Sequence, residues 1–146
     1  MVETNKSCGT SKTVFPSGDA RMPSEQTRAF AQTIRVLPES VDEYKALHAR
    51  VWPEVLESLR DVGVLDMKIF HSGDRLFMFM TTVKDFRAEI DFARHLSMSK
   101  RCVEWSELTK TFQKPVPEAA GDDWWTYMEP VFDFRSQLNA LADAQT

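Results

Sequence analysis

An apolar repeat of helical period, interrupted by a proline, is the feature that most limits how this chain can fold. One side of the predicted helix carries Val41, Leu47, Val51, Val55, Leu59 and Val62. Pro53 lies within the repeat, and a proline removes a backbone donor and strains the preceding turn. The pattern therefore predicts a helix over residues 41–62 that kinks or restarts near Pro53 and turns its apolar side toward the body of the fold.

Three unusual side chains lie on or beside that side of the helix. At about 100° per residue, Tyr44 and His48 fall within the apolar stripe and Trp52 lies next to them. A phenol, an imidazole and an indole are thus spaced one turn apart. A histidine on an apolar helix face is more often a core residue than a catalyst, so the pattern alone leaves both interpretations open.

An alternating pattern predicts a strand before this helix, over residues 28–37. Phe30, Ile34 and Val36 share one side of that strand, and Gln32 shares it too. Buried polar groups need hydrogen-bond partners. Gln32 is therefore either a hydrogen-bonded core residue or a group that lines a cavity.

Two further alternating segments, residues 65–71 and 75–83, predict a hairpin around a turn that contains Gly73. The second of these strands is apolar on both faces, with Phe77 and Phe79 on one and Leu76, Met78 and Met80 on the other. A strand of this kind is central in its sheet or covered on both sides.

Capping and breaking residues predict where the helices begin and end. Ser40 with Glu43 three residues later predicts a capping box for the first helix, and Gly63 predicts its end. Asp85 is the predicted cap of a second helical region, which Ser97 to Ser99 divide into two segments.

The last part of the chain predicts a loop, an edge strand and a tail. Residues 114–121 contain prolines and a glycine without periodicity, which is typical of a loop. Residues 128–134 form the predicted last strand, placed at an edge because Pro130 cannot donate a ladder hydrogen bond. Residues 135–146 predict a short polar helix or a frayed tail.

The predicted order of elements is strand, helix, strand, strand, helix, strand. This order is typical of an α+β fold of the ferredoxin-like type, with a four-stranded antiparallel sheet and the helices on one face. The other face of the sheet then carries large apolar side chains, a larger exposed patch than a soluble monomer tolerates. We therefore expect a homodimer, a dimeric α+β barrel in which two open sheet faces pack together.

Length and composition indicate one folded domain and exclude several classes of partner. The 146 residues allow one ordinary domain, which we expect over residues 28–134, after a flexible extension at 1–27 and before a tail at 135–146. The net charge of -4 argues against a nucleic-acid surface, and no apolar run is long enough for a membrane span. Two isolated cysteines and no apolar signal core predict a cytosolic protein.

The candidate chemistry is limited by what the sequence lacks. The three histidines, His48, His71 and His95, have no zinc spacing, and the glycines lie singly rather than in a phosphate loop. His71 and His95 are expected to be exposed. Aromatic planes beside a histidine and scattered polar groups suit a sugar, whose C–H faces pack on indole while its hydroxyls need directional partners. Histidine is also the residue that passes protons most readily near neutral pH.

At this point the residues resemble a known family. The run Tyr44-x3-His48-x3-Trp52-Pro-Glu, the following Gly63 and the later Trp105 are similar to the pattern of L-rhamnose mutarotases, with a match over residues 28–134. The resemblance implies a ferredoxin-like dimer that uses no cofactor and binds no metal. It also implies an isomerase that interconverts the pyranose anomers of 6-deoxy sugars such as L-rhamnose or L-fucose.

The resemblance also implies site residues. His48 corresponds to the proton donor, an imidazolium that protonates the ring oxygen, and Tyr44 and Trp52 to substrate contacts. Family members hold sugar with a tyrosine in the second strand and paired tryptophans in the second helical region; the matching positions here are Met67 and Glu104-Trp105. Glu104 could accept a hydrogen bond from a sugar hydroxyl or simply be solvated, and the base could be this carboxylate, a second side chain or water. Trp124 with Trp125 could restore an aromatic wall.

Two other classes of function stay open at the level of sequence. One is a binding module, a dimeric α+β barrel that holds a sugar without converting it, which the loss of the tyrosine and one tryptophan would fit. The other is a cofactor-free monooxygenase or haem-handling enzyme built on the same kind of barrel.

Overall fold

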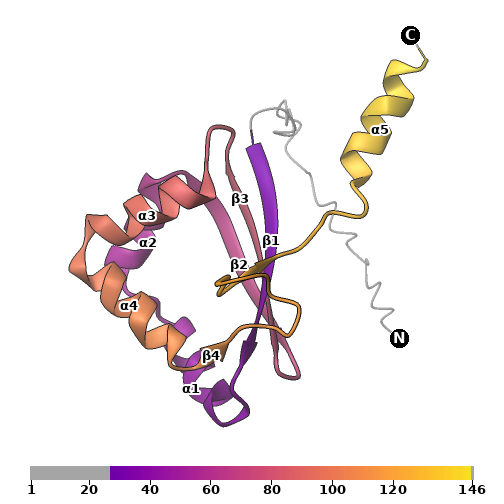
Figure 1. Ribbon diagram of the computed structural model, residues 1–146. Helices are drawn as coiled ribbons and strands as arrows, with labels where there is room; N and C mark the ends of the chain where they lie inside the picture. Colours follow the sequence, from indigo (N-terminus) through magenta and orange to yellow (C-terminus); the bar gives the residue numbers. More distant parts are fainter. Residues whose placement is uncertain (1–26, 146) are drawn as a thin grey trace, which may run out of the picture.

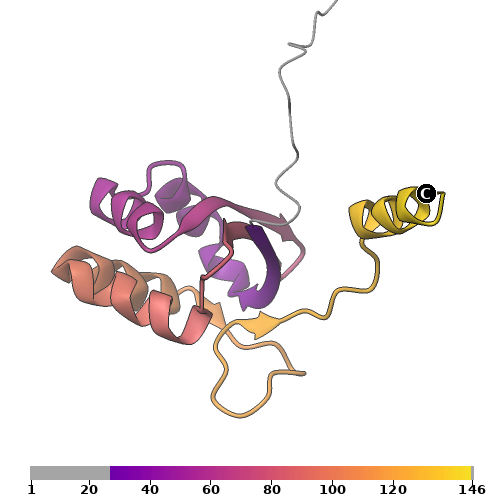
Figure 2. The same cartoon turned by 90° about the horizontal axis from the view of Figure 1, so that it is seen from above.

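A computed structural model describes residues 27–145 of the chain, and the extension expected at residues 1–27 lies outside this part except for Thr27. Figures 1 and 2 show the helices packed on one side of a curled sheet, except for the last helix of the chain, which is set apart from it. The strands are β1 (Thr27–Val36), β2 (Val64–Ser72), β3 (Arg75–Val83), β4 (Gln113–Lys114) and β5 (Thr126–Tyr127). The helices are α1 (Val41–His48), α2 (Pro53–Asp61), α3 (Ala88–Met98), α4 (Lys100–Lys110) and α5 (Phe134–Asp143), preceded by a 3-10 turn at Pro38–Ser40.

The sheet is antiparallel and has the order β2-β3-β1-β4, with β5 also paired to β1. Strand β3 is central, as its two apolar faces predicted. One face lies under the helices, where Leu76, Met78 and Met80 are buried. The predicted α+β, ferredoxin-like class is confirmed by this order and by the placement of α1 to α4 on one face.

The predicted helix over residues 41–62 is broken where expected. Helix α1 ends at His48 and α2 begins at Pro53, whose missing amide hydrogen is harmless in a first helical turn. Trp52 is extended, as a residue before proline must be, with φ -60° and ψ 136°. The break lets α1 and α2 pack on different parts of the sheet and on α4.

A bulge corrects the expected alternation of the second strand. Val64 pairs with Thr82 and Asp66 with Thr81, so Leu65 is the extra residue and its side chain is 57% exposed. The bulge leaves Val64 and Met67 on the helix-covered face. The predicted alternation over residues 65–71 was therefore wrong for Leu65, its first residue.

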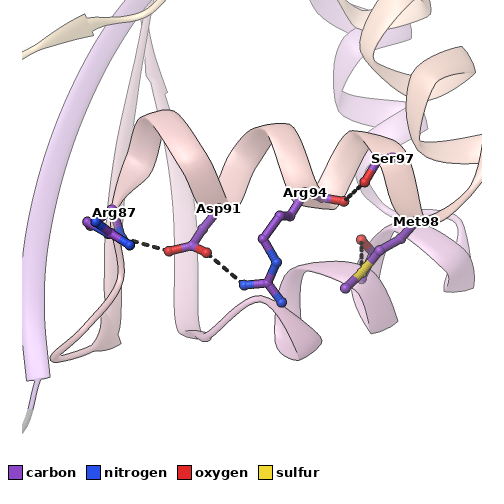
Figure 3. A network of polar contacts seen from close by, with 6 residues as sticks. Arg87, Asp91, Arg94, Ser97 and Met98 are labelled. Atoms are coloured by element: carbon purple, nitrogen blue, oxygen red, sulfur yellow. Dashed lines mark hydrogen bonds and ion pairs between the residues drawn. The ribbon is translucent and has the colours of Figure 1, made fainter.

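Two predicted helix caps were also wrong. Ser40 makes no capping hydrogen bond with its side chain, because the 3-10 turn over Pro38–Ser40 leads directly into α1. The second helical region begins at Ala88 rather than after Asp85, and Asp91 accepts a hydrogen bond from the backbone N–H of Arg87 at 2.7 Å. Figure 3 shows Asp91 also bound to Arg94, at 2.8 Å. The predicted division at Ser97 to Ser99 is confirmed, and Ser99 caps α4.

The predicted last strand over residues 128–134 was wrong. The ladder next to β1 is made instead by two short strands, β4 directly after α4 and β5 just before the predicted segment. Met128 adds one backbone hydrogen bond to Ala31, at 2.8 Å, and the chain then leaves the sheet before Pro130. A proline two residues along cannot extend the ladder.

Phe134–Asp143 form α5, so within the described part of the predicted tail the helix is observed. Val131, Phe132 and Phe134 at its approach are 95%, 66% and 63% exposed. The face of the sheet opposite the helices is also open, and Phe70 on it is 55% exposed. Within residues 27–145, no helix is long and apolar enough to cross a membrane.

The close packing around Gly63, between α2 and β2, can be tested by mutation. Its φ is +108°, and a Cβ at this position would lie 2.6 Å from Cγ2 of Val83. We expect Gly63→Ala to lower the free energy of unfolding by roughly 2–4 kcal/mol, the sum of backbone strain and overpacking. Urea denaturation monitored by tryptophan fluorescence measures this loss.

Gly73→Ala is the matched control, because Gly73 also has positive φ, +59°, but meets nothing within 4 Å. Only the backbone cost of about 1–2 kcal/mol is then expected. Equal losses for the two variants would show that the contact with Val83 does not matter.

Candidate active site

Tyr44 and His48 lie one helical turn apart on the buried side of α1. Their rings stack with centroids 4.0 Å apart and an angle of 24° between the planes. Tyr44 is 4% exposed and packs with Ile34, Val36 and Leu76 from the sheet. The imidazole is therefore held on one side by a phenol that is itself fixed in the core.

A backbone hydrogen bond fixes the orientation of His48. Its Nδ1 lies 2.9 Å from the carbonyl oxygen of Tyr44. A carbonyl only accepts, so Nδ1 carries the hydrogen and, in the neutral ring, Nε2 carries the lone pair. Nε2 has no hydrogen-bond partner among the residues that the structure describes, which leaves it available to a ligand.

Aromatic side chains from α4 and the α1–α2 junction pack behind the imidazole. Trp105 contacts His48 edge-on at 5.2 Å between centroids, and Trp52 contacts Trp105 in the same way at 5.1 Å. The guanidinium of Arg101 lies 3.6 Å from the centroid of Trp52. Trp52 thus supports Trp105 from outside.

A cavity of about 430 Å³ lies between the sheet and the helices, in the range of small-molecule sites. Its aromatic and imidazole lining consists of Tyr44, His48, Phe92, His95, Trp105, Trp124 and Trp125. Its other polar lining consists of Gln32, Ser106, Thr109, Lys110 and Gln113. The remaining walls are aliphatic or sulfur-containing, and Met67 is one of them.

Not every residue proposed from the sequence lines this cavity. Tyr44, His48, Met67 and Trp105 do, whereas Trp52 and Glu104 do not. The Glu104 carboxylate is bound at the surface, 3.1 Å from Arg101 and 3.9 Å from Lys100. Among the six, the structure brings together four around the cavity.

The strand pattern left Gln32 as either a hydrogen-bonded core residue or a group that lines a cavity. It is 6% exposed and lines the cavity from β1, on the floor formed by the sheet. Its side-chain amide makes no hydrogen bond to any described residue, so both its donor and its acceptor are available to a ligand. The cavity-lining interpretation is the one observed.

Gln113 is a cavity residue that the sequence did not single out. It is 6% exposed in β4 and joins two other lining residues, because its side chain bonds both Tyr44 and Trp124. The segment that contains it was expected to be a helix end and a loop, so no pattern placed it beside Tyr44.

His95 was expected to be exposed and is instead 8% exposed on α3. Its Nδ1 lies 2.7 Å from the hydroxyl of Ser58 on α2, which also donates to the backbone carbonyl of His95 at 3.1 Å. Its proximity to the helix end suggested exposure, but α2 packs against this end of α3 and buries it. His71, by contrast, is exposed beside the hairpin turn as expected.

Burial governs the protonation of the site. Removal from water lowers the pKa of His48 from its ordinary value of 6.5, and the bond to the Tyr44 carbonyl only partly opposes this. Burial likewise raises the pKa of the Tyr44 phenol to about 12. At neutral pH the site therefore contains a neutral imidazole that can accept a proton and a phenol that keeps its own.

Within residues 27–145, no group of three or more His, Cys, Asp or Glu side chains could hold a metal ion. The cavity is lined by two imidazoles, three indoles and several amide and hydroxyl groups. This combination can hold a small polyhydroxylated molecule and move a proton on and off it.

Comparison with known proteins gives a consistent result. Residues 29–134 match the model of a protein family described as L-rhamnose mutarotase. The chain is 35% identical to a UPF0734 protein of Dictyostelium discoideum over 117 residues, covering 77% of this chain and 94% of that one. It is also 35% identical over 94 residues to an L-fucose mutarotase of Xanthomonas campestris, covering 63% of this chain and 74% of the relative.

A solved structure supports the fold. The crystal structure of an L-rhamnose mutarotase from Formosa agariphila superposes with a TM-score of 0.55, covering 73% of this chain and 98% of that one. The two sequences are 21% identical, so this likeness supports the fold rather than the activity.

The protonation of His48 can be tested directly. We expect its imidazole to titrate below 6.5, and the Trp105→Ala variant to move the midpoint back toward 6.5 because water then reaches the ring. The measurement is the Cε1–H chemical shift as a function of pH by two-dimensional NMR. A native midpoint at or above 6.5 would contradict the burial argument.

Proposed function

We propose, from the fact that this chain belongs to the L-rhamnose mutarotase family, that it interconverts the α and β pyranose anomers of a 6-deoxy hexose. The substrate class is that of L-rhamnose and L-fucose, the sugars named for its relatives. The activity is that of an isomerase of the aldose mutarotase class, within the racemases and epimerases that act on carbohydrates.

The observation that carries this proposal is the state of His48. Its Nδ1–H is bound to the Tyr44 carbonyl at 2.9 Å, and Nε2 belongs to a neutral ring on the wall of an aromatic cavity. A single nitrogen in this state can take a proton from one oxygen of a bound sugar and return it to another. Ring opening needs those two transfers, and ring closure needs the same two in reverse.

The proposed mechanism uses His48 as both base and acid. Nε2 removes the proton from the anomeric hydroxyl, and the C1–O5 bond breaks as the ring oxygen takes that proton back from Nε2. The product is the open-chain aldehyde. After rotation about the C1–C2 bond, the O5 hydroxyl gives its proton to Nε2 as it attacks the other face of C1, and Nε2 passes that proton to the former carbonyl oxygen.

This order replaces the imidazolium expected from the resemblance, because burial lowers the pKa of His48. The neutral ring is then the starting form, and the imidazolium exists only between the two transfers. Acid–base placement of this kind contributes about 10²–10⁴-fold, which suffices for a reaction that already proceeds in water.

Sugar binding is proposed to combine stacking with hydrogen bonds. Trp105, Trp124 and Trp125 offer indole faces for the C–H faces of a pyranose, and Gln32 offers an amide without a protein partner among the described residues. Met67 supplies an apolar surface where relatives are expected to place a hydroxyl. A methyl group in place of the sugar's terminal hydroxymethyl would suit such a surface.

A binding module is the second candidate. Glu104 is bound at the surface by two basic residues. Of the two proton-transfer residues proposed from the sequence, only His48 therefore lines the cavity, and no carboxylate belongs to its described lining. A protein that only held the sugar would need nothing more.

We also propose that the chain forms a homodimer through its open sheet face and acts in the cytosol. The dimer rests on the exposed Phe70 and Phe79 of that face and on the half-buried Phe77, whose ring centroid lies 6.1 Å from that of Phe70. The location rests on the cysteine usage of the chain.

His48→Gln is the test of the proposed activity. We expect it to reduce the anomer exchange rate of L-rhamnose or L-fucose by about 10²–10⁴-fold, because an amide cannot carry the proton between the two oxygens. Saturation-transfer NMR between the α and β resonances measures the rate. His71→Gln, a change of the exposed histidine at the hairpin, is the matched control and should leave the rate unchanged.

The pH profile separates the two starting forms of His48. With the neutral ring as the starting form, the rate above buffer background falls in acid with a midpoint below 6.5 and is level at neutral pH. An imidazolium start gives the opposite slope. Sugar binding without accelerated exchange in the native chain would establish the binding module instead.

The dimer has its own test. Phe70→Glu places a charge on the open face and is expected to convert the dimer to a monomer, since a buried unpaired charge is strongly unfavourable. Leu56→Glu is the control, because Leu56 is 54% exposed on α2, in the helical layer. Light scattering after size exclusion measures the mass, and a native monomer would exclude the proposal.

A further inference from the structure

Gln113 connects two cavity residues through one side-chain amide. The indole Nε1 of Trp124 lies 2.9 Å from Oε1 of Gln113, and Nε2 of Gln113 lies 3.3 Å from the hydroxyl oxygen of Tyr44. The three residues come from α1, β4 and the segment before β5, and all three line the cavity. They form a continuous hydrogen-bonded chain along its wall.

The direction of each bond in this chain is fixed by chemistry. An indole N–H can only donate, so the atom of Gln113 that faces Trp124 must be the carbonyl oxygen. The other end of the amide is then the NH₂ group, which can only donate. The hydroxyl oxygen of Tyr44 must therefore accept the bond from Gln113.

Accepting that bond leaves the hydroxyl hydrogen of Tyr44 free to be donated to a ligand. Its hydroxyl hydrogen is not used in the bond to Gln113, and no other hydrogen bond joins this hydroxyl to a described residue. Burial keeps the proton on the phenol at neutral pH. Since Tyr44 lines the cavity, that hydrogen is available to an acceptor inside it.

We propose that Gln113 and Trp124 are positioning residues that make Tyr44 an obligate hydrogen-bond donor to an oxygen of the bound sugar. The inference rests on the proposed function for its ligand. It adds the direction of one hydrogen bond, from the Tyr44 hydroxyl to the sugar. The sugar oxygen that faces Tyr44 must accept. That oxygen lies near the reacting atoms, because the Tyr44 ring stacks on His48 at 4.0 Å.

Gln113→Glu reverses this polarity without changing the shape of the side chain. A carboxylate only accepts, so it receives hydrogen bonds from both Trp124 and Tyr44 and draws the phenol hydrogen away from the cavity. Gln113→Met is the matched control. It has a similar length and removes both bonds, but it leaves the Tyr44 hydroxyl free to rotate and donate to the sugar.

The two variants rank in opposite orders for the two possible roles of Gln113. If the amide sets the polarity of Tyr44, KM for anomer exchange rises about tenfold in Gln113→Glu and distinctly less in Gln113→Met, with a smaller effect on kcat. If the amide only holds the wall together, Gln113→Met is the more damaged variant, because it loses both bonds while the carboxylate keeps both. That second order would overturn the proposal.

The measurements are anomer exchange by saturation-transfer NMR at several L-rhamnose concentrations, and the dissociation constant of the same sugar by ligand-observed NMR. The indole N–H resonance of Trp124 reports whether its bond to residue 113 persists in each variant. If the native chain binds L-rhamnose but does not exchange its anomers, the proposed function fails, and the order of dissociation constants still tests the role of Gln113. If exchange is present but Gln113→Met is impaired as much as Gln113→Glu, only this inference fails.

Discussion

The missing amide hydrogen of Pro53 is the constraint on which the helical layer depends. It divides one amphipathic repeat into α1 and α2, and each then packs on its own cluster. Tyr44 of α1 packs with Ile34, Val36 and Leu76, while Val55 of α2 packs with Cys102 and Trp105. The cavity is lined by residues of both clusters, so it lies where the two helices pack on different parts of the fold.

The site obtains its chemistry from position rather than from charge. The Tyr44 carbonyl fixes the tautomer of His48, the aromatic rings around it keep the imidazole neutral, and a neutral imidazole is the form that can accept a proton. The same dryness keeps the Tyr44 phenol protonated. The imidazole of His48 can thus exchange a proton while the phenol of Tyr44 keeps its own, although the two rings are stacked one turn apart on α1.

Much of the fold could be predicted from the sequence, because it depends on local periodicity and on residues with fixed backbone preferences. The break at Pro53, the central strand β3 and the hairpin are of this kind, and so is the placement of Tyr44 and His48 on a buried face. The site could be predicted only as far as it lies on that helix. The family resemblance, which depends on the spacing from Tyr44 to Glu54, supplied the reaction.

The errors have more than one physical cause. Asp91 rather than Asp85 binds the first turn of α3 through a bond to Arg87 four residues away, whereas burial of His95 is a tertiary effect that depends on α2 packing against it. The short strands β4 and β5 carry too few residues for any alternation to appear, so the last strand was placed beyond them. Gln113 gained its role from partners 69 and 11 residues away, which no local window contains.

Those two short strands have a consequence for how this kind of site can change over time. The imidazole proposed to carry the proton belongs to a helix anchored in the core, whereas Gln113, Trp124 and Trp125 belong to a segment whose strand pairing with the sheet is limited to two residues at either end. The loop between those two short strands is where changes in length and sequence are tolerated best. Two of the three indoles proposed to hold the sugar therefore lie on this segment, apart from the helix that carries His48, and Gln113 links the two parts through Tyr44.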